Sequence, residues 1–338
     1  MSPMRTANHK PRYGVVVVSW NNESLLADCF ESVRAQTIGA DRVDAYLVDN
    51  GSTDDSVALV RKNFPEVTII EQGWNSLFAA ANNVGIRAAF SDPSVAGVVL
   101  LNSDARLSEN WFEIVGSFSE TRPLGASFQA LTRDHANPAI IDSHHLYVNR
   151  SLHSTQWGSG TSADRGFANQ RVFGVNAAAA LYMRTFFEAQ PFDDLLDEKM
   201  GIYLEDVDVA ARALMMGWEN WFVAGTDATH MGSVSTNKQA GGFALRRTWR
   251  NQFVLLLTNF PVRVLLRGFG ALVAHEVGAV RHLRATGRGS IVGELWRGRT
   301  EGIRLVPYAL KRRRQLAPFV VADPEFVWEL MQTGTVVT

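Results

Sequence analysis

Short apolar runs alternate with amphipathic helical patterns along the first third of this 338-residue chain. Four runs have the length of strands, at residues 13–19, 43–48, 67–70 and 97–101. The first run, Tyr-Gly-Val-Val-Val-Val-Ser, is typical of a strand buried on both faces of a sheet. Three intervening stretches place apolar residues on one helical stripe, at 23–36, 54–64 and 77–90. Strands alternating with helices predict βαβ units, and therefore an α/β fold with a mostly parallel central sheet flanked by helices.

The middle of the chain has a weaker pattern. Loops are expected to dominate over 131–170, and 151–170 is rich enough in Ser, Gly, Thr, Asp and Asn to predict a mobile segment. A helix is predicted over 205–216, followed by a strand over 221–224. The glycine-bounded stretch 232–242 is expected to be a flexible loop.

Charge divides the chain into two parts. The net charge is −1, but residues 1–240 hold 28 acidic and 18 basic residues, whereas residues 241–338 hold 6 acidic and 15 basic residues. In the second part, arginines occur with Trp, Phe and Leu at helical spacing, which is typical of an interfacial amphipathic helix. We expect an α/β domain over 1–240 and a basic, helical C-terminal extension over 241–338. The extension is expected to contact an anionic membrane, a diphosphate-bearing acceptor or a partner subunit of a homodimer, and these alternatives stay open.

Apolar segments and cysteine content indicate the expected compartment. The N-terminus lacks the apolar core of a signal peptide, and no apolar run approaches the roughly 18 residues of a membrane span. A single cysteine excludes an internal disulfide, and Cys29 lies on the apolar stripe of the first predicted helix, so we expect it in the core. A cytoplasmic protein is expected, either free or peripheral on the inner face of the cytoplasmic membrane.

Polar residues follow the first two predicted strands, at the edge where open α/β sheets bind ligands. The second strand runs into Asp49 and then Asn-Gly-Ser-Thr. A carboxylate there can accept a hydrogen bond from a base N–H or a ribose hydroxyl, but the same residues can also form a turn that caps the next helix. Both interpretations stay open from the residues alone. The first strand ends at Ser19 without a glycine-rich fingerprint, which argues against a standard NAD site.

A second polar cluster, Asn102-Ser103-Asp104, follows the strand at 97–101. Two oxygen ligands one residue apart can point the same way from an extended chain, as binding of a divalent cation requires. The alternative is a turn that caps a helix beginning near Glu109. His230 becomes a metal-ligand candidate beside such a cluster, because imidazole binds transition metals such as Mn²⁺, although a lone histidine is more often structural.

An acidic cluster opens the predicted helix at 205–216. Glu205, Asp206 and Asp208 occupy three of its first four positions, where the helix dipole favours negative charge. A carboxylate in a cleft beside a metal and a nucleotide can also act as a general base toward an attacking hydroxyl. Asp208 and Arg212 have the i, i+4 spacing of an ion pair, which predicts a structural role for Asp208.

Two further features are candidates for the acceptor side. His144 and His145 are adjacent, so in a strand their side chains would point to opposite faces, and we expect a loop or acceptor-side role rather than a metal pair. Trp157 lies in the Ser- and Gly-rich segment and could stack on a sugar, although most tryptophans are core or interface residues.

The order of the motifs is more specific than any one of them. The chain carries in sequence VVVVSWNN, VDNGSTDDS, WNSLFAAANNVGI, VVLLNSDA, FDD, YLEDVDVAARALMMGW and THMGS. This series, over about residues 12–260, resembles the family 2 glycosyltransferases with a GT-A fold, in particular their bacterial rhamnosyltransferase-like and galactofuranosyltransferase-like branch. The resemblance implies a Rossmann-like sheet and an inverting enzyme that transfers a sugar from a nucleotide-diphosphate donor with the help of Mn²⁺ or Mg²⁺.

The resemblance also implies which residues hold the nucleotide-sugar. The matching positions are Ser19, Asp49, Asn83, Asn102, Ser103 and Asp104. Asp49 is expected to contact the base, and Asn83 lies in the segment that lines the donor pocket. The chain departs from the family in three places. The neutral Asn102 begins the DxD-type motif, Leu77 stands where the branch often has glycine, and the segment between 192–194 and Glu205 is a few residues longer than usual.

Metal and catalytic roles follow from the same match. Asp104 and His230 are expected to bind the metal, and Asp206, with Glu205 beside it, to act as the general base in a direct displacement. The expected donor is dTDP-L-rhamnose, and the expected acceptor is a glycan or a polyprenyl-diphosphate-linked sugar in bacterial cell-surface polysaccharide synthesis.

Three other functions are weighed against this one. The first is a galactofuranosyl or other UDP-sugar transferase of the same fold, and the second is a catalytically silent nucleotide-sugar-binding protein, which the neutral Asn102 keeps open. A nucleotidyltransferase is disfavoured, because no glycine-rich phosphate loop with an associated lysine lies near the first strand. No nucleic-acid partner is expected.

Overall fold

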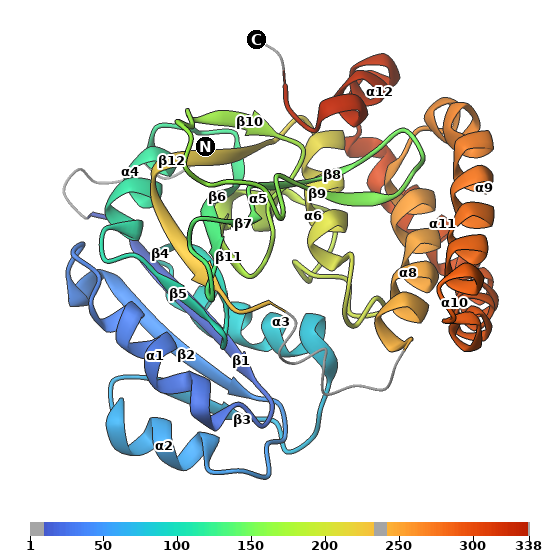
Figure 1. Cartoon of the computed structure of the whole chain (residues 1–338). Coiled ribbons are helices and arrows are strands. Elements are labelled where there is room, and N and C mark those ends of the chain that lie inside the picture. Colours follow the sequence, from blue (N-terminus) through green and yellow to red (C-terminus); the bar gives the residue numbers. More distant parts are fainter. Residues whose placement is uncertain (1–9, 233–241, 337–338) are drawn as a thin grey trace.

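Four parallel strands form one half of the central sheet (Figure 1). The computed structural model describes residues 10–232 and 242–336. Strand β1 (Arg12–Ser19) lies between β2 (Val43–Asp49) and β4 (Val95–Asn102), and β3 (Thr68–Glu71) pairs with the far side of β2. The connecting helices are α1 (Glu23–Arg34), α2 (Ser56–Asn63) and α3 (Leu77–Phe90), with a 3₁₀ turn at Ala40–Arg42. The predicted α/β class is confirmed.

The other half of the sheet is mixed. Strand β11 (Ala179–Met183) runs antiparallel between β4 and β6 (Gly125–Asp134), and β12 (Glu219–His230) runs parallel to β6. Three short strands complete this half: β5 (Ala105–Leu107), β7 (Ile141–Ser143) and β10 (Gln170–Val172). A separate two-stranded sheet pairs β8 (His145–Val148) with β9 (Ser154–Trp157).

Loops dominate 131–170, as predicted, but this region also holds the end of β6 and all of β7, β8 and β9, which the sequence pattern did not predict. These strands have only three or four residues, too few to produce a readable alternation, and burial of Ile141, Leu146 and Val148 holds them in place. Strand β12 is much longer than the predicted 221–224, because a shift in pairing register between Phe222 and Asp227 interrupts its pattern.

Helices cover both faces of the sheet. One core contains apolar residues of α1 and α2, including Phe30 and Val60, against β1, β2 and β4. It also holds Phe112 of a π-helical turn (Phe112–Gly116) that precedes α4 (Ser117–Glu120). Cys29 lies in this core, as predicted. The opposite core packs α3, α5 (Arg184–Ala189) and α6 (Glu205–Met215) on the other face.

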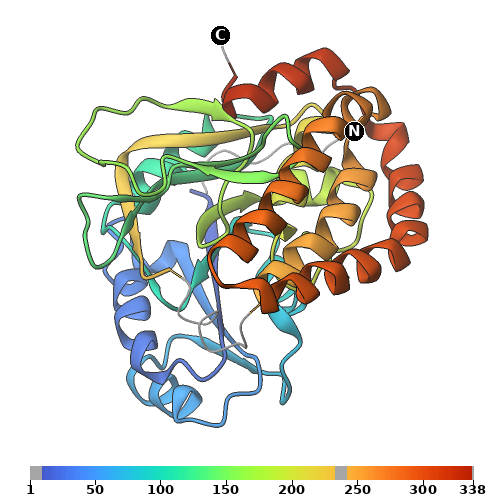
Figure 2. The ribbon, with the colours of Figure 1, turned by 45° about the vertical axis from the view of Figure 1, so that its right-hand side comes forward.

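The C-terminal extension is helical, as predicted, and packs on the α6 side of the sheet (Figure 2). Its helices are α8 (Phe243–Asn259), α9 (Val262–Ala285), α10 (Val292–Arg304), α11 (Val306–Leu316) and α12 (Pro324–Thr333), with 3₁₀ turns at Gly289–Ile291 and Ala317–Phe319. Val254 and Val327 of the extension share one apolar core with Val207 and Leu214 of α6. The boundary at residue 240 stays a prediction, and the predicted loop at 232–242 lies almost entirely outside the described residues.

Several basic residues of the extension bind inside the protein. Arg312 of α11 is buried between Asp197 and Asp208, with its guanidinium 3.6 Å from the ring centre of Phe192. Asp208 also forms the predicted ion pair with Arg212, at 3.7 Å between Oδ2 and Nη2. The basic excess of 241–338 is therefore only partly available to an external partner. Within the described ranges, no helix combines the length and apolar character needed to span a bilayer.

Candidate active site

A cavity of about 460 Å³ opens beyond the carboxyl ends of β1 and β4. Because β1 has β2 on one side and β4 on the other, the chain reverses direction across the sheet here, and such switch points are where open α/β sheets bind ligands. The walls come from α3, β9, α6 and the end of β12, and Thr248 of α8 closes one side. The volume is that of an ordinary small-molecule site.

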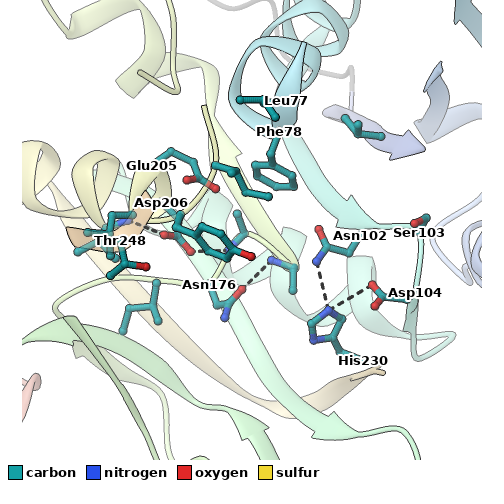
Figure 3. Close-up of a pocket in the computed structure, with 18 of the residues that line it drawn as sticks. Leu77, Phe78, Asn102, Ser103, Asp104, Asn176, Glu205, Asp206, His230 and Thr248 are labelled. Atoms are coloured by element: carbon teal, nitrogen blue, oxygen red, sulfur yellow. Dashed lines mark hydrogen bonds and ion pairs between the residues drawn. The ribbon is translucent and has the colours of Figure 1, made fainter. Parts of the chain in front are cut away.

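One wall carries the predicted metal-ligand residues (Figure 3). Asn102 ends β4, and Ser103 and Asp104 form the turn into β5, so the expected helix cap near Glu109 is wrong. Strand β12 pairs with β5 and brings His230 opposite Ala105. His230 Nε2 lies 3.3 Å from Asp104 Oδ1 and 3.2 Å from Asn102 Nδ2. The fold therefore joins two motifs that are 126 residues apart in the sequence.

Asp142 of β7 fixes the orientation of His230. Its Oδ2 lies 3.0 Å from Nδ1 of the imidazole, which leaves Nε2 facing Asp104 and the cavity. Burial alone would lower the pKa of His230, but the hydrogen bonds and charges of Asp104 and Asp142 outweigh it and raise the pKa to about 9. A carboxylate on the far nitrogen of a histidine is a common arrangement behind metal-binding imidazoles.

The wall that carries Asp104 and His230 fits a divalent cation whose other ligands come from a substrate. No group of three or more His, Cys, Asp or Glu side chains within 10–232 and 242–336 is arranged to hold a metal alone. Two ligands at right angles, each about 2.1 Å from one cation, lie about 3 Å apart. The 3.3 Å between Asp104 Oδ1 and His230 Nε2 matches that separation. Cations of this kind are often bound by one or two protein groups and by substrate phosphates.

The opposite wall carries the acidic pair that opens α6 (Figure 3). Asp206 Oδ1 accepts a hydrogen bond from its neighbour Val207 N at 2.8 Å, and burial raises the pKa of Asp206 to about 6. Glu205 is more deeply buried, and burial together with the charge of Asp206 raises its pKa well above the usual range. At neutral pH, Asp206 is therefore the carboxylate of the pair that can accept a proton.

The segment before α6 has unusual backbone geometry. Tyr203 and Leu204 both have φ of +70°, a left-handed conformation that side chains disfavour. Both residues line the cavity, and their strain points to a local shape fixed by the site. Asn251 of α8 stabilises it by donating hydrogen bonds to the carbonyl oxygens of Met200 and Ile202 at 2.9 and 3.0 Å.

Leu77 at the start of α3 has the same left-handed geometry, with φ of +69°. The position where the family branch often has glycine is thus one where glycine is conformationally favoured. Leu77 and Phe78 line the cavity, so this segment does border the predicted donor pocket. Asn83 does not line it: its Nδ2 donates to Leu196 O at 2.8 Å and its Oδ1 accepts from Leu196 N at 3.1 Å.

Ser19 and Asp49 lie side by side at the carboxyl ends of β1 and β2, just below the cavity. Both are buried, and the cavity wall is formed instead by their neighbours Trp20 and Asn50. The Asp49 carboxylate accepts hydrogen bonds from Gly51 N and Ser52 N, each at 3.2 Å. This is the turn that the sequence offered as the structural alternative.

The two acceptor-side candidates do not line the cavity. His144 is buried and stacks on Phe222 with 3.6 Å between ring centres, and burial lowers the pKa of both His144 and His145. His144 does lie in the bend between β7 and β8, whereas His145 begins β8, and neither has an acceptor-side position because both pack in the protein interior. Trp157 stacks on His145 with 5.4 Å between ring centres, whereas Thr155 and Gln156 beside it line the cavity.

Four residues at or behind the site were not among the predicted site residues. Asn50 accepts a hydrogen bond from Ser76 N at 2.8 Å and so shapes the turn before α3. Asp142 and Asn251 do not line the cavity but form hydrogen bonds to His230 and to the segment before α6. Thr248 of the C-terminal extension lines the cavity. Asn50 belongs to a quoted motif and could have been considered. The other three belong to no motif, and only the fold brings them to the site.

Known proteins match this chain in sequence and in fold. The glycosyl transferase family 2 profile matches residues 14–189, just over half of the chain. The N-acetylglucosaminyl-diphospho-decaprenol L-rhamnosyltransferase of Mycobacterium tuberculosis is 23% identical over 258 residues, which cover 69% of this chain and 82% of that protein.

Solved structures show the same architecture. Residues 1–349 of TarS from S. aureus superpose with a TM-score of 0.54 at 13% identity, over 94% of this chain and 90% of that one. The mannosyltransferase PcManGT from Pyrobaculum calidifontis, solved with GDP-Man and Mn²⁺, superposes with a TM-score of 0.52 at 15% identity, over 92% and 86% of the two chains. The expected GT-A fold is confirmed. The chain belongs to glycosyl transferase family 2 and is a glycosyltransferase that uses a nucleotide-sugar donor.

Proposed function

We propose that this protein transfers an L-rhamnosyl group from dTDP-L-rhamnose to a lipid-linked sugar acceptor in bacterial cell-surface polysaccharide synthesis. The reaction is a direct displacement with inversion at the anomeric carbon, and it depends on Mn²⁺ or Mg²⁺. The choice of donor and acceptor is supported by the 23% identity to a protein named as a rhamnosyltransferase with a diphospho-decaprenol acceptor.

The observation that supports the mechanism most is the placement of the acidic groups on opposite walls of one cavity (Figure 3). Asp104 and His230 on one wall would hold the cation and, through it, the diphosphate of the donor. Asp206 on the other wall would face the acceptor. A base and a leaving group on opposite sides of the reacting carbon are what an in-line displacement requires.

The bonds change as follows. The acceptor hydroxyl oxygen forms the new bond to the anomeric carbon, and its proton passes to the Asp206 carboxylate. The bond between the anomeric carbon and the diphosphate oxygen breaks, and its electron pair leaves with the nucleoside diphosphate. When bound, a divalent cation offsets the negative charge that develops on that diphosphate. A double displacement would need a second carboxylate as nucleophile, and Glu205 is a poor candidate because burial and the charge of Asp206 raise its pKa, which disfavours the ionised form.

A donor screen tests the proposal. The full chain would be incubated with Mn²⁺ and with dTDP-L-rhamnose, UDP-galactofuranose, UDP-N-acetylglucosamine or GDP-mannose, each with a polyprenyl-diphosphate-linked N-acetylglucosamine acceptor. We expect acceptor-dependent release of dTDP. Preference for a UDP-sugar would replace the proposed donor and retain the mechanism. Release that continues unchanged in the presence of EDTA would contradict the metal-dependent mechanism.

A further inference from the structure

The longest helix of the extension carries an apolar stripe on its outward side. Five side chains of α9 form it, each between 43% and 72% exposed: Val262, Leu266, Phe269, Val273 and Val277. They recur every three or four residues, so they lie on one side of the helix over roughly 22 Å. We call these five residues the α9 stripe. Scattered exposed apolar residues are ordinary, but a continuous row marks an interaction surface.

The α9 stripe lies on the side of the helix that does not pack on the rest of the protein. The inner side of the helix is buried at Val264, Gly268 and Leu283, and the Gly268 position is so close to Leu152 that a Cβ atom there would lie 2.7 Å from its Cγ. The helix is therefore held firmly by its inner side. It lies at the edge of the molecule in Figure 1 and on the side that turns forward in Figure 2.

A row of arginines flanks the stripe. At about 100° per residue, Arg263, Arg267 and Arg281 fall together on one side of it. Arg267 forms an ion pair with Glu325 at 2.6 Å, but Arg263 and Arg281 have no ion-pair partner among the described residues. The only acidic residue of α9, Glu276, is paired with Arg299 of α10. The outward side of α9 is therefore apolar and positively charged, and among the ion pairs of the described residues only Glu325 offsets part of the arginine row.

The apolar stripe and the arginine row distinguish between two partners that could cover this side of α9, a second copy of the chain and a lipid bilayer. A second copy docked through the same stripe would bring two arginine rows together, with Arg263 and Arg281 of each row unpaired by any acidic residue of their own chain among the described residues. An anionic bilayer offers an apolar phase for the stripe and negative headgroups for the arginines, as interfacial helices require. We propose that this protein lies on an anionic phospholipid bilayer with the α9 stripe in the interface and the arginine row on the headgroups. This inference rests on the proposed function in one respect, because a lipid-linked acceptor lies in such a bilayer.

Vesicle flotation of the full chain, without donor or acceptor, tests the inference. Vesicles of phosphatidylcholine with one-third phosphatidylglycerol should retain the protein about tenfold better than vesicles of phosphatidylcholine alone, and high salt should reduce the difference. Leu266→Asp should lower the partition to anionic vesicles about tenfold, because it places a charge in the stripe. Arg263→Glu with Arg281→Glu should abolish the preference for anionic lipid.

Leu124→Asp is the matched control, because Leu124 is also more than half exposed but lies between α4 and β6, away from α9. It should float like the wild type. The inference is overturned if the wild type does not float with anionic vesicles, or if Leu266→Asp and Leu124→Asp float equally. It is also overturned if Leu266→Asp converts a dimer to a monomer by light scattering, since a second copy would then cover the stripe. Nucleotide release with a water-soluble acceptor, measured on the same samples, separates this inference from the proposed function.

Discussion

The side-chain amide of Asn251 donates a hydrogen bond to the carbonyl oxygen of Tyr203, with 2.7 Å between Nδ2 and O. Asn251 lies in α8 of the extension, and Tyr203 lies in the left-handed segment two residues before Glu205. The C-terminal extension thus fixes the backbone from which the acidic pair projects. In the proposed mechanism, this contact would make Asn251 a positioning residue for Asp206.

Asn251→Ala should therefore lower turnover more than its loss of stability explains. With the amide gone, the left-handed segment can relax and displace the Asp206 carboxylate, and we expect kcat to fall about 10- to 100-fold while the KM for donor changes little. Asn259→Ala is the matched control, because Asn259 is a buried asparagine of the same helix that binds Asp208 at 2.7 Å and not the segment. Equal kcat values for the two variants would contradict the positioning role.

Asp142→Asn should weaken cation binding. The new amide oxygen can still accept a hydrogen bond from the His230 ring. The substitution removes the negative charge that makes the imidazole a strong ligand, so we expect the affinity for Mn²⁺ to fall about 10- to 100-fold. Electron paramagnetic resonance titration of Mn²⁺ in the presence of nucleoside diphosphate measures it directly. Asp134→Asn on the neighbouring strand β6 is the control, because its carboxylate accepts from Asn137 N instead. An unchanged Mn²⁺ affinity in Asp142→Asn would refute this role.

Arg312→Leu should strongly destabilise the protein. It leaves the buried carboxylates of Asp197 and Asp208 without that cation, and breaking such a buried pair typically costs about 3–5 kcal/mol. Urea denaturation followed by circular dichroism would measure the change in the free energy of unfolding. Arg314→Leu, two residues away and exposed, should alter it by no more than about 0.5 kcal/mol. Similar losses for both variants would mean that Arg312 is not part of an internal ion network.

The activity should depend on pH through Asp206. Its carboxyl must be ionised to accept a proton, and burial raises its pKa to about 6, so kcat/KM should fall as the pH decreases through about 6 and level off above about 7. Rates of nucleoside diphosphate release at saturating Mn²⁺ would give the profile. A rate that is constant from about pH 5 to pH 7.5 would exclude this carboxylate as the base.

The first half of the fold was predictable because β1, β2 and β4 are long, apolar and separated by regular helices. Long strands buried on both faces leave a strong pattern in the sequence. The short strands β7, β8 and β9 leave none, since pairing and burial at distant contacts stabilise them more than local preference does. The acceptor-side expectation for His144 and His145 was wrong for that reason: their packing on Phe222 and Trp157 depends on segments that only the fold brings together.

Only part of the candidate site was predictable: Ser19, Asp49 and Asn83 do not line the cavity, and the partners of the residues that do were not foreseen. Asp104, His230, Glu205 and Asp206 do line one cavity. The residues that orient them, Asp142 and Asn251, are common polar residues at unremarkable positions, and their function comes from three-dimensional contacts alone. The sequence could not show that Arg312 and Arg299 of the basic extension are paired with acidic residues of the same chain, so the charge available to an external partner is smaller than the count suggests.

Asp206→Asn tests the central claim most directly. The amide keeps the shape of the side chain but cannot take the hydroxyl proton, so nucleoside diphosphate release with acceptor should fall about 10²- to 10⁴-fold. Donor binding, measured by calorimetry, should stay within about twofold, because the cation and diphosphate contacts are on the other wall. The melting temperature at pH 8 should not decrease, since an ionised, largely buried carboxylate is removed. Near-normal release by a folded Asp206→Asn protein would contradict the account.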